Sequence, residues 1–191
     1  MPIPKKLLGY LDKDKTKYEI VEHKKVYTAF DLANTLKLKL SEIAKTLLVK
    51  TDKEYYLVVL PAHYRLDLVK LKKILNAKKI TIAKENVMQK VFKVKPGAIT
   101  PFGFIHKTKV VMDKSLNKSV KVLLGSGSFK ESIAMKVKDY VKMVEPIQGI
   151  FAKQFMPDLI AKPKQLKSKK KAKKKRVAKK TPKKNKTKRR K

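Results

Sequence analysis

The uneven distribution of positive charge constrains this chain more than any other feature of its sequence. Residues 161–191 contain 19 Lys or Arg and no Asp or Glu. The whole chain has a formal net charge of +36, so residues 1–160 carry the remaining +17. A segment that is so charged and so poor in apolar residues buries too little surface to offset its ordering entropy. We therefore expect the folded part to lie before a disordered basic C-terminal tail.

The residues before the tail have the composition of one folded domain. The chain is 42% hydrophobic, which supplies a single core at this length. Its densest apolar runs, 57–60 and 122–124, are far shorter than the roughly 18 residues that indicate a membrane-spanning helix. Charge interrupts residues 1–13 before an apolar secretory signal can develop. We expect no membrane span, a soluble domain at 1–150, a transitional segment at 151–166 and the tail at 167–191.

Several kinds of chemistry have no support in the sequence. The chain has no cysteine, which excludes disulfides, a thiolate nucleophile and Cys-ligated zinc. His23, His63 and His106 share no metal-ligand spacing, so we expect no metal site. No Gly-x-Gly-x-x-Gly follows a predicted strand, and neither a Walker A motif nor a Gly-x-Ser-x-Gly elbow occurs. Nucleotide hydrolysis and serine-triad catalysis are therefore not indicated.

Local patterns predict a mixed α/β (α+β) fold. Thr28 followed by Asp31 forms a capping box for a helix over 29–36, and Asp67 can N-cap the next helix. A short polar link, 50–53, joins two apolar runs and predicts an antiparallel hairpin. Strands are expected at 18–23, 45–49, 55–60, 79–83, 109–112, 120–124 and 132–137, and further helices at 68–75, 85–92 and 139–144. We expect a mixed, largely antiparallel sheet flanked by helices.

Two short segments place a chemically active element beside plain core residues. Lys45 opens the apolar strand at 45–49, where partial desolvation would strengthen its charge against a developing oxyanion. Gly97 and Pro101 punctuate the loop at 97–103; glycine permits close approach to backbone amides and proline fixes the loop's shape. Each feature also has a plain interpretation, a surface lysine and a rigid turn.

In this order, with Gly97 placed 52 residues after Lys45, the segments resemble the YbaK/prolyl-tRNA-synthetase-associated family of aminoacyl-tRNA editing domains. The resemblance covers about residues 16–145. Lys45-Thr46-Leu47 matches the family's K-T-L pattern, whose lysine is the central functional side chain. The resemblance implies Lys45 and Gly97 as catalytic residues. It implies substrate-binding roles for Thr46, Ala98, Pro101, Phe102, Gly103, Gly125, Ser126, Gly127, His23 and Phe30.

The sequence departs from the family pattern at two positions. Gly125-Ser126-Gly127 stands where relatives commonly have S-G-G, so only a backbone role carries over. Ser132 stands where some relatives have an aspartate, which leaves amino-acid selectivity open. His23 matches a family histidine, although a polar residue at a strand end is the alternative. Asp113 is expected to cap the turn at 113–116.

The resemblance implies a cytoplasmic trans-editing hydrolase, without metal or cofactor, that deacylates mischarged Cys- or Ala-tRNA, often tRNA for proline. A synthetase is a possible partner. The basic tail would grip the nucleic-acid backbone, because neutralising phosphates releases counterions. The alternative is a non-catalytic nucleic-acid- or ribosome-binding module on the same fold. The sequence leaves open which amino acid is removed, which tRNA is recognised and the oligomeric state.

Overall fold

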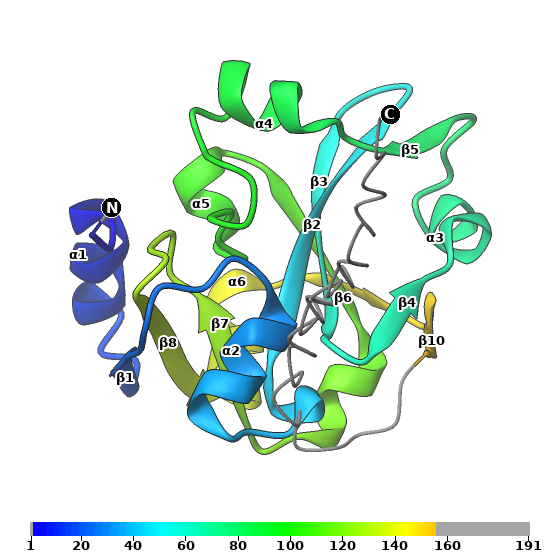
Figure 1. The fold of residues 1–191 in the computed structure, drawn as a ribbon. Helices are drawn as coiled ribbons and strands as arrows, with labels where there is room; N and C mark the ends of the chain where they lie inside the picture. Colours follow the sequence, from blue (N-terminus) through cyan, green and yellow to red (C-terminus); the bar gives the residue numbers. More distant parts are fainter. Residues whose placement is uncertain (1, 156–191) are drawn as a thin grey trace, which may run out of the picture.

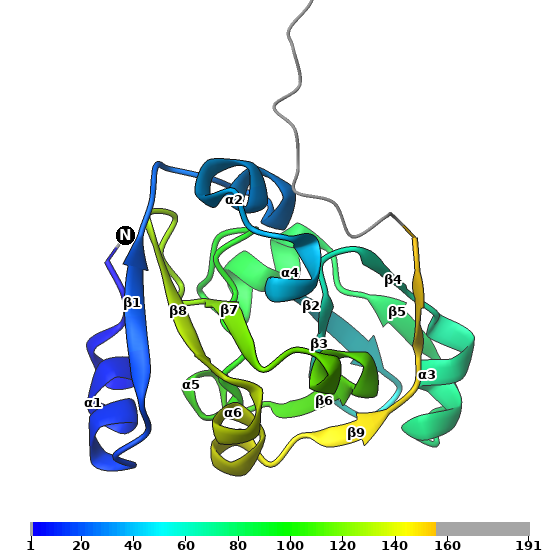
Figure 2. The same cartoon turned by 90° about the horizontal axis from the view of Figure 1, so that it is seen from below.

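The computed structural model describes residues 2–155, which form an α+β fold built on two main sheets (Figures 1 and 2). A three-stranded antiparallel sheet, order β1-β8-β7, lies on one side of the molecule beside α1, and a five-stranded sheet, order β5-β2-β3-β6-β9, extends toward α3 on the other side. A two-stranded sheet pairs β10 with β4. The strands are β1 Tyr18–Glu22, β2 Ala44–Thr51, β3 Tyr55–Pro61, β4 Tyr64–Leu66, β5 Ile80–Ile82, β6 Lys109–Asp113, β7 Lys121–Gly125, β8 Glu131–Lys136, β9 Ile147–Gly149 and β10 Ala152–Gln154.

Helices and short 3-10 turns connect these strands. They are α1 Lys5–Lys13, α2 Ala29–Leu36, η1 Leu40–Glu42, α3 Leu68–Ile74, α4 Glu85–Lys90, α5 Gly103–His106, η2 Lys114–Lys118 and α6 Val137–Val144. The predicted mixed, largely antiparallel pairing is confirmed: β3–β6 and β6–β9 are parallel and the other pairs of these sheets are antiparallel. The strands are divided among three sheets, whereas the sequence suggested one.

The two main sheets meet at the start of β2. Ile43 forms a single parallel bridge with Leu123 of β7, and both side chains are buried in one apolar cluster under α2. Lys45 follows two residues later and pairs with Leu60 in the predicted β2–β3 hairpin. The seam between the sheets therefore fixes the position of Lys45.

Side-chain caps set three element boundaries as predicted. The Thr28 hydroxyl accepts a hydrogen bond from the Asp31 amide at 3.0 Å and begins α2. The Asp67 carboxylate accepts from two amides of the first turn of α3. Asp113 caps η2 through the Ser115 amide at 2.9 Å. Each cap satisfies an amide that the helix itself leaves unpaired.

The sequence did not predict α1. Its N-cap, Pro4, provides no side-chain hydrogen bond, and four of its nine residues are charged. Leu7 and Leu11 are nevertheless fully buried in the largest core cluster, together with Phe102 and Tyr140. These two leucines, one helical turn apart, hold α1 against the domain.

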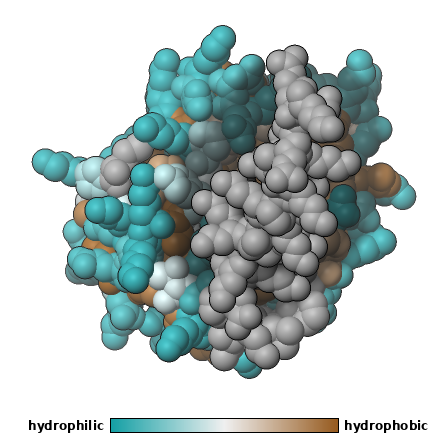
Figure 3. Space-filling model, in the orientation of Figure 1, coloured by the Kyte–Doolittle hydropathy of each residue, from teal (hydrophilic) through white to brown (hydrophobic). Residues whose placement is uncertain are grey.

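Figure 3 shows hydrophilic side chains projecting around much of the edge of one face, with hydrophobic ones between them.

The chain continues past residue 150 as part of the fold. Phe151 is fully buried, and β10 pairs with β4. The second carboxylate oxygen of Asp113 accepts from the Phe151 and Ala152 amides at 2.7 and 2.8 Å. Residues 151–155, expected to be transitional, thus contribute a short strand rather than an amphipathic turn. The rest of that segment and the tail at 167–191 lie outside the described residues.

Candidate active site

A small cavity of about 160 Å³ opens where the two main sheets meet. Three parts of the chain enclose it: the β1–α2 connection with the first turn of α2, the start of β2, and the Gly97 loop together with the β7–β8 turn. Its lining residues are His23, Val26, Tyr27, Thr28, Ala29, Leu32, Ile43, Ala44, Lys45, Thr46, Gly97, Ile99, Gly125, Ser128 and Ser132. The cavity therefore combines one ammonium group with hydroxyls, an imidazole and apolar walls.

Lys45 is the cation of this cavity. Its Nζ donates hydrogen bonds to the Ala62 carbonyl at 3.1 Å, on the β3–β4 connection, and to the carbonyl of Tyr64, the first residue of β4. Burial lowers the pKa of Lys45, because the charged ammonium is desolvated there. An ammonium group has three donors, so the two carbonyls orient it and leave one hydrogen for a ligand.

Gly97 lines the cavity in a backbone conformation that needs glycine. Its φ is +82°, and a Cβ at this position would lie 2.7 Å from the Tyr27 carbonyl oxygen. A side chain would therefore be strained in backbone conformation and would collide with backbone. The close approach keeps the Gly97 loop tightly against the β1–α2 connection.

His23 and Ser132 form a hydrogen-bonded pair at the cavity. His23 Nδ1 lies 2.9 Å from the Lys24 carbonyl oxygen, and Nε2 lies 3.0 Å from the Ser132 hydroxyl. A carbonyl can only accept, so Nδ1 carries a proton, and in the neutral ring Nε2 accepts from Ser132. Ser132 is 3% exposed. The pair presents a fixed hydroxyl and imidazole at the lining of the cavity.

The cavity brings together five of the twelve residues that the family resemblance implies. His23, Lys45, Thr46, Gly97 and Gly125 line it. Lys45 and Gly97 line the same cavity, although 52 residues separate them in the sequence. A site that positions a substrate needs such residues around one cavity.

The other seven implied residues do not line the cavity. Phe102 is fully buried in the core, and the Pro101 carbonyl accepts a hydrogen bond from the Tyr140 hydroxyl. The Ser126 hydroxyl donates to the Glu131 carbonyl at 2.6 Å and shapes the β7–β8 turn. These side chains support the loop and the turn. The remaining four, Ala98, Gly103, Gly127 and Phe30, likewise lie outside the lining set.

Sequence reasoning missed Tyr27, Ile99 and Ser128 as lining residues, and it treated Thr28 only as a helix cap. Thr28 lines the cavity as well as capping α2. Tyr27 precedes the cap directly, with 57% of its surface exposed.

Among residues 2–155, no group of three or more His, Asp or Glu side chains is arranged to hold a metal ion. Within the same residues, no helix is long and apolar enough to cross a membrane.

Comparison with known proteins assigns the family. The model of the aminoacyl-tRNA editing domain matches residues 23–143. The chain belongs to the aminoacyl-tRNA editing domain family. The matched range begins at His23 and contains every lining residue of the cavity, so the whole site lies inside the editing domain.

Several individual proteins are similar to this chain. The prolyl-tRNA editing protein ProX of Acetoanaerobium sticklandii is 28% identical over 145 residues, which cover 73% of this chain and 88% of ProX. A proline–tRNA ligase of Staphylococcus saprophyticus is 29% identical over 106 residues, 56% of this chain but only 19% of the ligase. The crystal structure of a candidate trans-editing enzyme for prolyl tRNA synthetase has a TM-score of 0.70 at 18% identity, covering 80% of this chain and 98% of that one. That structure supports the fold alone.

Proposed function

We propose that this protein is a trans-acting hydrolase that deacylates mischarged aminoacyl-tRNA. The observation that carries the proposal is the placement of Lys45, a half-buried ammonium held by two backbone carbonyls with one hydrogen left for a ligand. The family assignment and the likeness to ProX over most of both chains support the same activity. Lys45 and Gly97 both line the same small cavity.

The proposed reaction is the hydrolysis of one ester bond. A water molecule attacks the carbonyl carbon, directly or after the neighbouring ribose hydroxyl has taken over the ester, and the bond between that carbon and the ribose oxygen breaks. With water as nucleophile, its oxygen joins the amino acid, and one of its protons goes to the departing ribose oxygen. The Lys45 ammonium and the amides of the Gly97 loop stabilise the negative charge that develops on the carbonyl oxygen. Neither a metal ion nor a covalent protein nucleophile takes part in this proposal.

The cavity's size favours a small aminoacyl group. Its volume of about 160 Å³ is below the roughly 300–1,000 Å³ of typical small-molecule sites. Alanine or cysteine would fit with the nucleoside left outside, and size exclusion would spare larger amino acids. The likeness to ProX and to part of a proline–tRNA ligase favours tRNA for proline as the carrier. A synthetase contact and action in the cytoplasm, where tRNA is charged, belong to the same proposal.

The test is deacylation of a panel of Cys-, Ala-, Ser- and Pro-charged tRNA for proline by the intact protein, with and without EDTA. We expect rapid loss of one or two of the small mischarged species, little loss of Pro-tRNA, and no effect of EDTA. Absence of turnover for every species, combined with tight salt-sensitive tRNA binding, would contradict the enzyme and favour the non-catalytic binding module. Loss of activity in EDTA would contradict the metal-free mechanism alone.

A further inference from the structure

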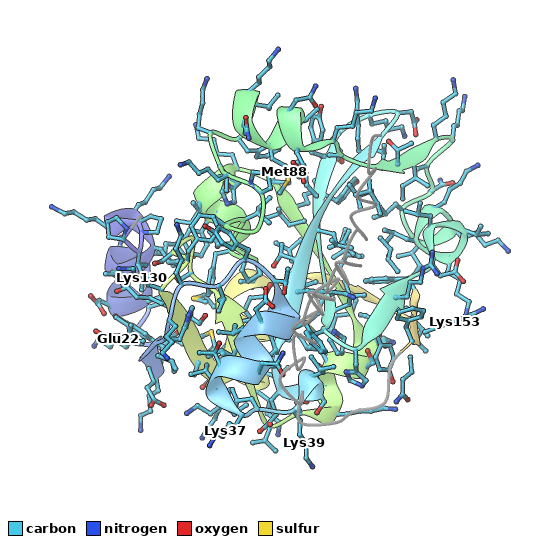
Figure 4. All side chains as sticks on the ribbon, in the orientation of Figure 1. Glu22, Lys37, Lys39, Met88, Lys130 and Lys153 are labelled. Carbon is cyan, nitrogen blue, oxygen red and sulfur yellow. The ribbon has the colours of Figure 1, made fainter. Side chains whose placement is uncertain are left out.

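A larger groove of about 760 Å³ adjoins the cavity and shares Tyr27 with it. It lies between the β1–α2 connection, the segment from α4 to the Gly97 loop, and the β7–β8 turn. Figure 4 labels Met88 on α4 and Lys130 at the β7–β8 turn, on two of these flanking elements. The lining residues are Lys25, Tyr27, Gln89, Lys93, Val94, Lys95, Pro96, Phe129 and Lys130.

The groove is strongly basic. Among its lining residues four are lysines and none is acidic. The ion pairs found within residues 2–155 involve Lys109, Lys121 and Lys153 instead. None of the four groove lysines takes part in these ion pairs, so their positive charge is available to an anionic ligand.

An exposed aromatic ring stands among these lysines. Tyr27 is 57% exposed, whereas Phe129 beneath it is 9% exposed. The two ring centroids lie 5.1 Å apart, and the Lys25 ammonium lies 5.2 Å from the Tyr27 ring centroid. Phe129 thus supports the Tyr27 ring from the protein side and leaves much of the residue accessible. A supported aromatic ring bordered by cations is the arrangement that binds single-stranded nucleic acid, with bases stacked on rings and phosphates near lysines.

The groove leads directly to the catalytic cavity. Pro96 lines the groove and Gly97 lines the cavity, and the close approach of Gly97 to the Tyr27 carbonyl ties the two walls together. A ligand whose aminoacyl end fills the small cavity must leave its remaining bulk outside. The groove meets the cavity at Tyr27 and can hold the rest of the ligand.

We propose that this groove binds the single-stranded 3′ end of the RNA, with a base preceding the terminal adenosine stacked on Tyr27 and its phosphates near Lys25, Lys93, Lys95 and Lys130. This inference rests on the proposed function, because it names how that substrate is held. An acidic polypeptide would satisfy the lysines but would make no use of the exposed ring. The combination of ring and charge therefore favours a polynucleotide.

The first experiment measures binding of an uncharged hexanucleotide RNA ending in CCA to the full chain by fluorescence anisotropy at several salt concentrations. Tyr27→Ala should weaken binding at least about 5-fold, since stacking on one ring contributes about 1–3 kcal/mol per base, and Tyr27→Phe should retain it. Tyr10→Ala is the matched control, because Tyr10 is exposed but stacks on Phe104 away from the groove. The tail contributes the same background to every variant.

The lysines have a separate readout. The double variant Lys93→Gln/Lys95→Gln should flatten the plot of log K against log salt by about 1.4, because each phosphate of a single strand that is no longer neutralised lowers the slope by roughly 0.7. The matched control is Lys72→Gln/Lys73→Gln on α3, which removes the same charge from residues outside the groove. Polyglutamate serves as a competitor. If it displaces the RNA equally well from the intact chain and from Tyr27→Ala, the ring has no role and the proposal is overturned.

A second experiment separates this proposal from the proposed function. The aminoacylated tRNA is compared with the aminoacyl ester of adenosine alone, which cannot reach the groove. The double variant should lower kcat/KM several-fold more for the tRNA than for the nucleoside ester. Equal effects on both substrates, with hexanucleotide binding unchanged, would overturn the groove while the deacylase stands. Ring-dependent hexanucleotide binding without any deacylation would support the groove and contradict the deacylase.

Discussion

The Tyr140 hydroxyl donates a hydrogen bond to the Pro101 carbonyl at 2.8 Å and so connects the closing helix α6 to the loop that carries Gly97. Tyr140 is fully buried, and burial raises the pKa of its hydroxyl well above the usual range. The hydroxyl is therefore always a donor at physiological pH. Through this bond the core holds the far end of the loop that forms one wall of the cavity.

Removing this hydroxyl should loosen the loop. Tyr140→Phe leaves the buried Pro101 carbonyl without its donor, which we expect to cost about 1–3 kcal/mol of unfolding free energy and to raise KM for the deacylation substrate. Urea unfolding and steady-state kinetics measure the two effects. Tyr56→Phe is the control, because the Tyr56 hydroxyl donates to Glu54, whose carboxylate keeps Lys109 as a partner. Equal stability losses in both variants would contradict the account of Tyr140.

A side chain at Gly97 should damage the site more than the fold. Gly97→Ala forces a φ of +82° on alanine and places its Cβ 2.7 Å from the Tyr27 carbonyl oxygen. We expect a destabilisation of about 1–3 kcal/mol and a loss of deacylation of tenfold or more, measured in the same preparations. Gly9→Ala is the matched control: nothing lies within 4 Å of its Cβ, and alanine in the helix should stabilise by about 0.5–1 kcal/mol. Full activity in Gly97→Ala would show that the close approach of Gly97 to the Tyr27 carbonyl is not needed for deacylation.

Ser132 should influence which amino acid is removed. Ser132→Ala leaves His23 Nε2 without its donor and should cost about 0.5–1.5 kcal/mol, while changing the ratio of kcat/KM between Cys-tRNA and Ala-tRNA. Ser126→Ala is the comparison, because Ser126 is equally buried and hydrogen-bonded but does not line the cavity. It should lose stability with the selectivity ratio unchanged. A ratio shifted equally in both variants would assign the effect to the turn rather than to Ser132.

The features that could be predicted from the sequence are those that depend on neighbours along the chain. The caps at Thr28 and Asp67 and the β2–β3 hairpin each need only a few consecutive residues, and local patterns predict all three. Strands β9 and β10 escape such patterns because they have three residues each, and distant partners, β6 and β4, define them. For α1, the spacing of Leu7 and Leu11 is a usable signal hidden among charged residues.

The site was harder to predict from the sequence than the fold, because its geometry depends on contacts between distant segments. His23 and Ser132 are separated by 109 positions, so no local pattern links them. Lys45 is identified through the family resemblance, whereas the carbonyls of Ala62 and Tyr64 that orient it come from the β3–β4 connection and the start of β4 and could not be anticipated. Phe102 has the pattern of a loop residue in sequence, yet the hydrophobic effect places it in the core.

The basic tail should act on affinity rather than on chemistry. Deleting residues 161–191 removes 19 cations, so we expect a higher KM for aminoacylated tRNA with little change in turnover at saturation. The dependence of log kcat/KM on log salt should flatten by about 0.7–0.9 for each phosphate that the tail neutralises in the intact protein. Kinetics at several salt concentrations test this, and an unchanged slope would show that the tail does not bind the tRNA phosphates.

The most direct test of the role of Lys45 in catalysis is the single-turnover deacylation rate of Lys45→Ala. It is measured on the charged tRNA that the intact protein deacylates fastest. Lys50→Ala is the matched control, because Lys50 lies on the same strand but is exposed and outside the cavity. Loss of a donor that stabilises a developing oxyanion typically costs about 10²–10³-fold in rate. We expect a loss of that size for Lys45→Ala and near-normal activity for Lys50→Ala. A rate for Lys45→Ala within about threefold of the control would contradict the role of this lysine in the reaction.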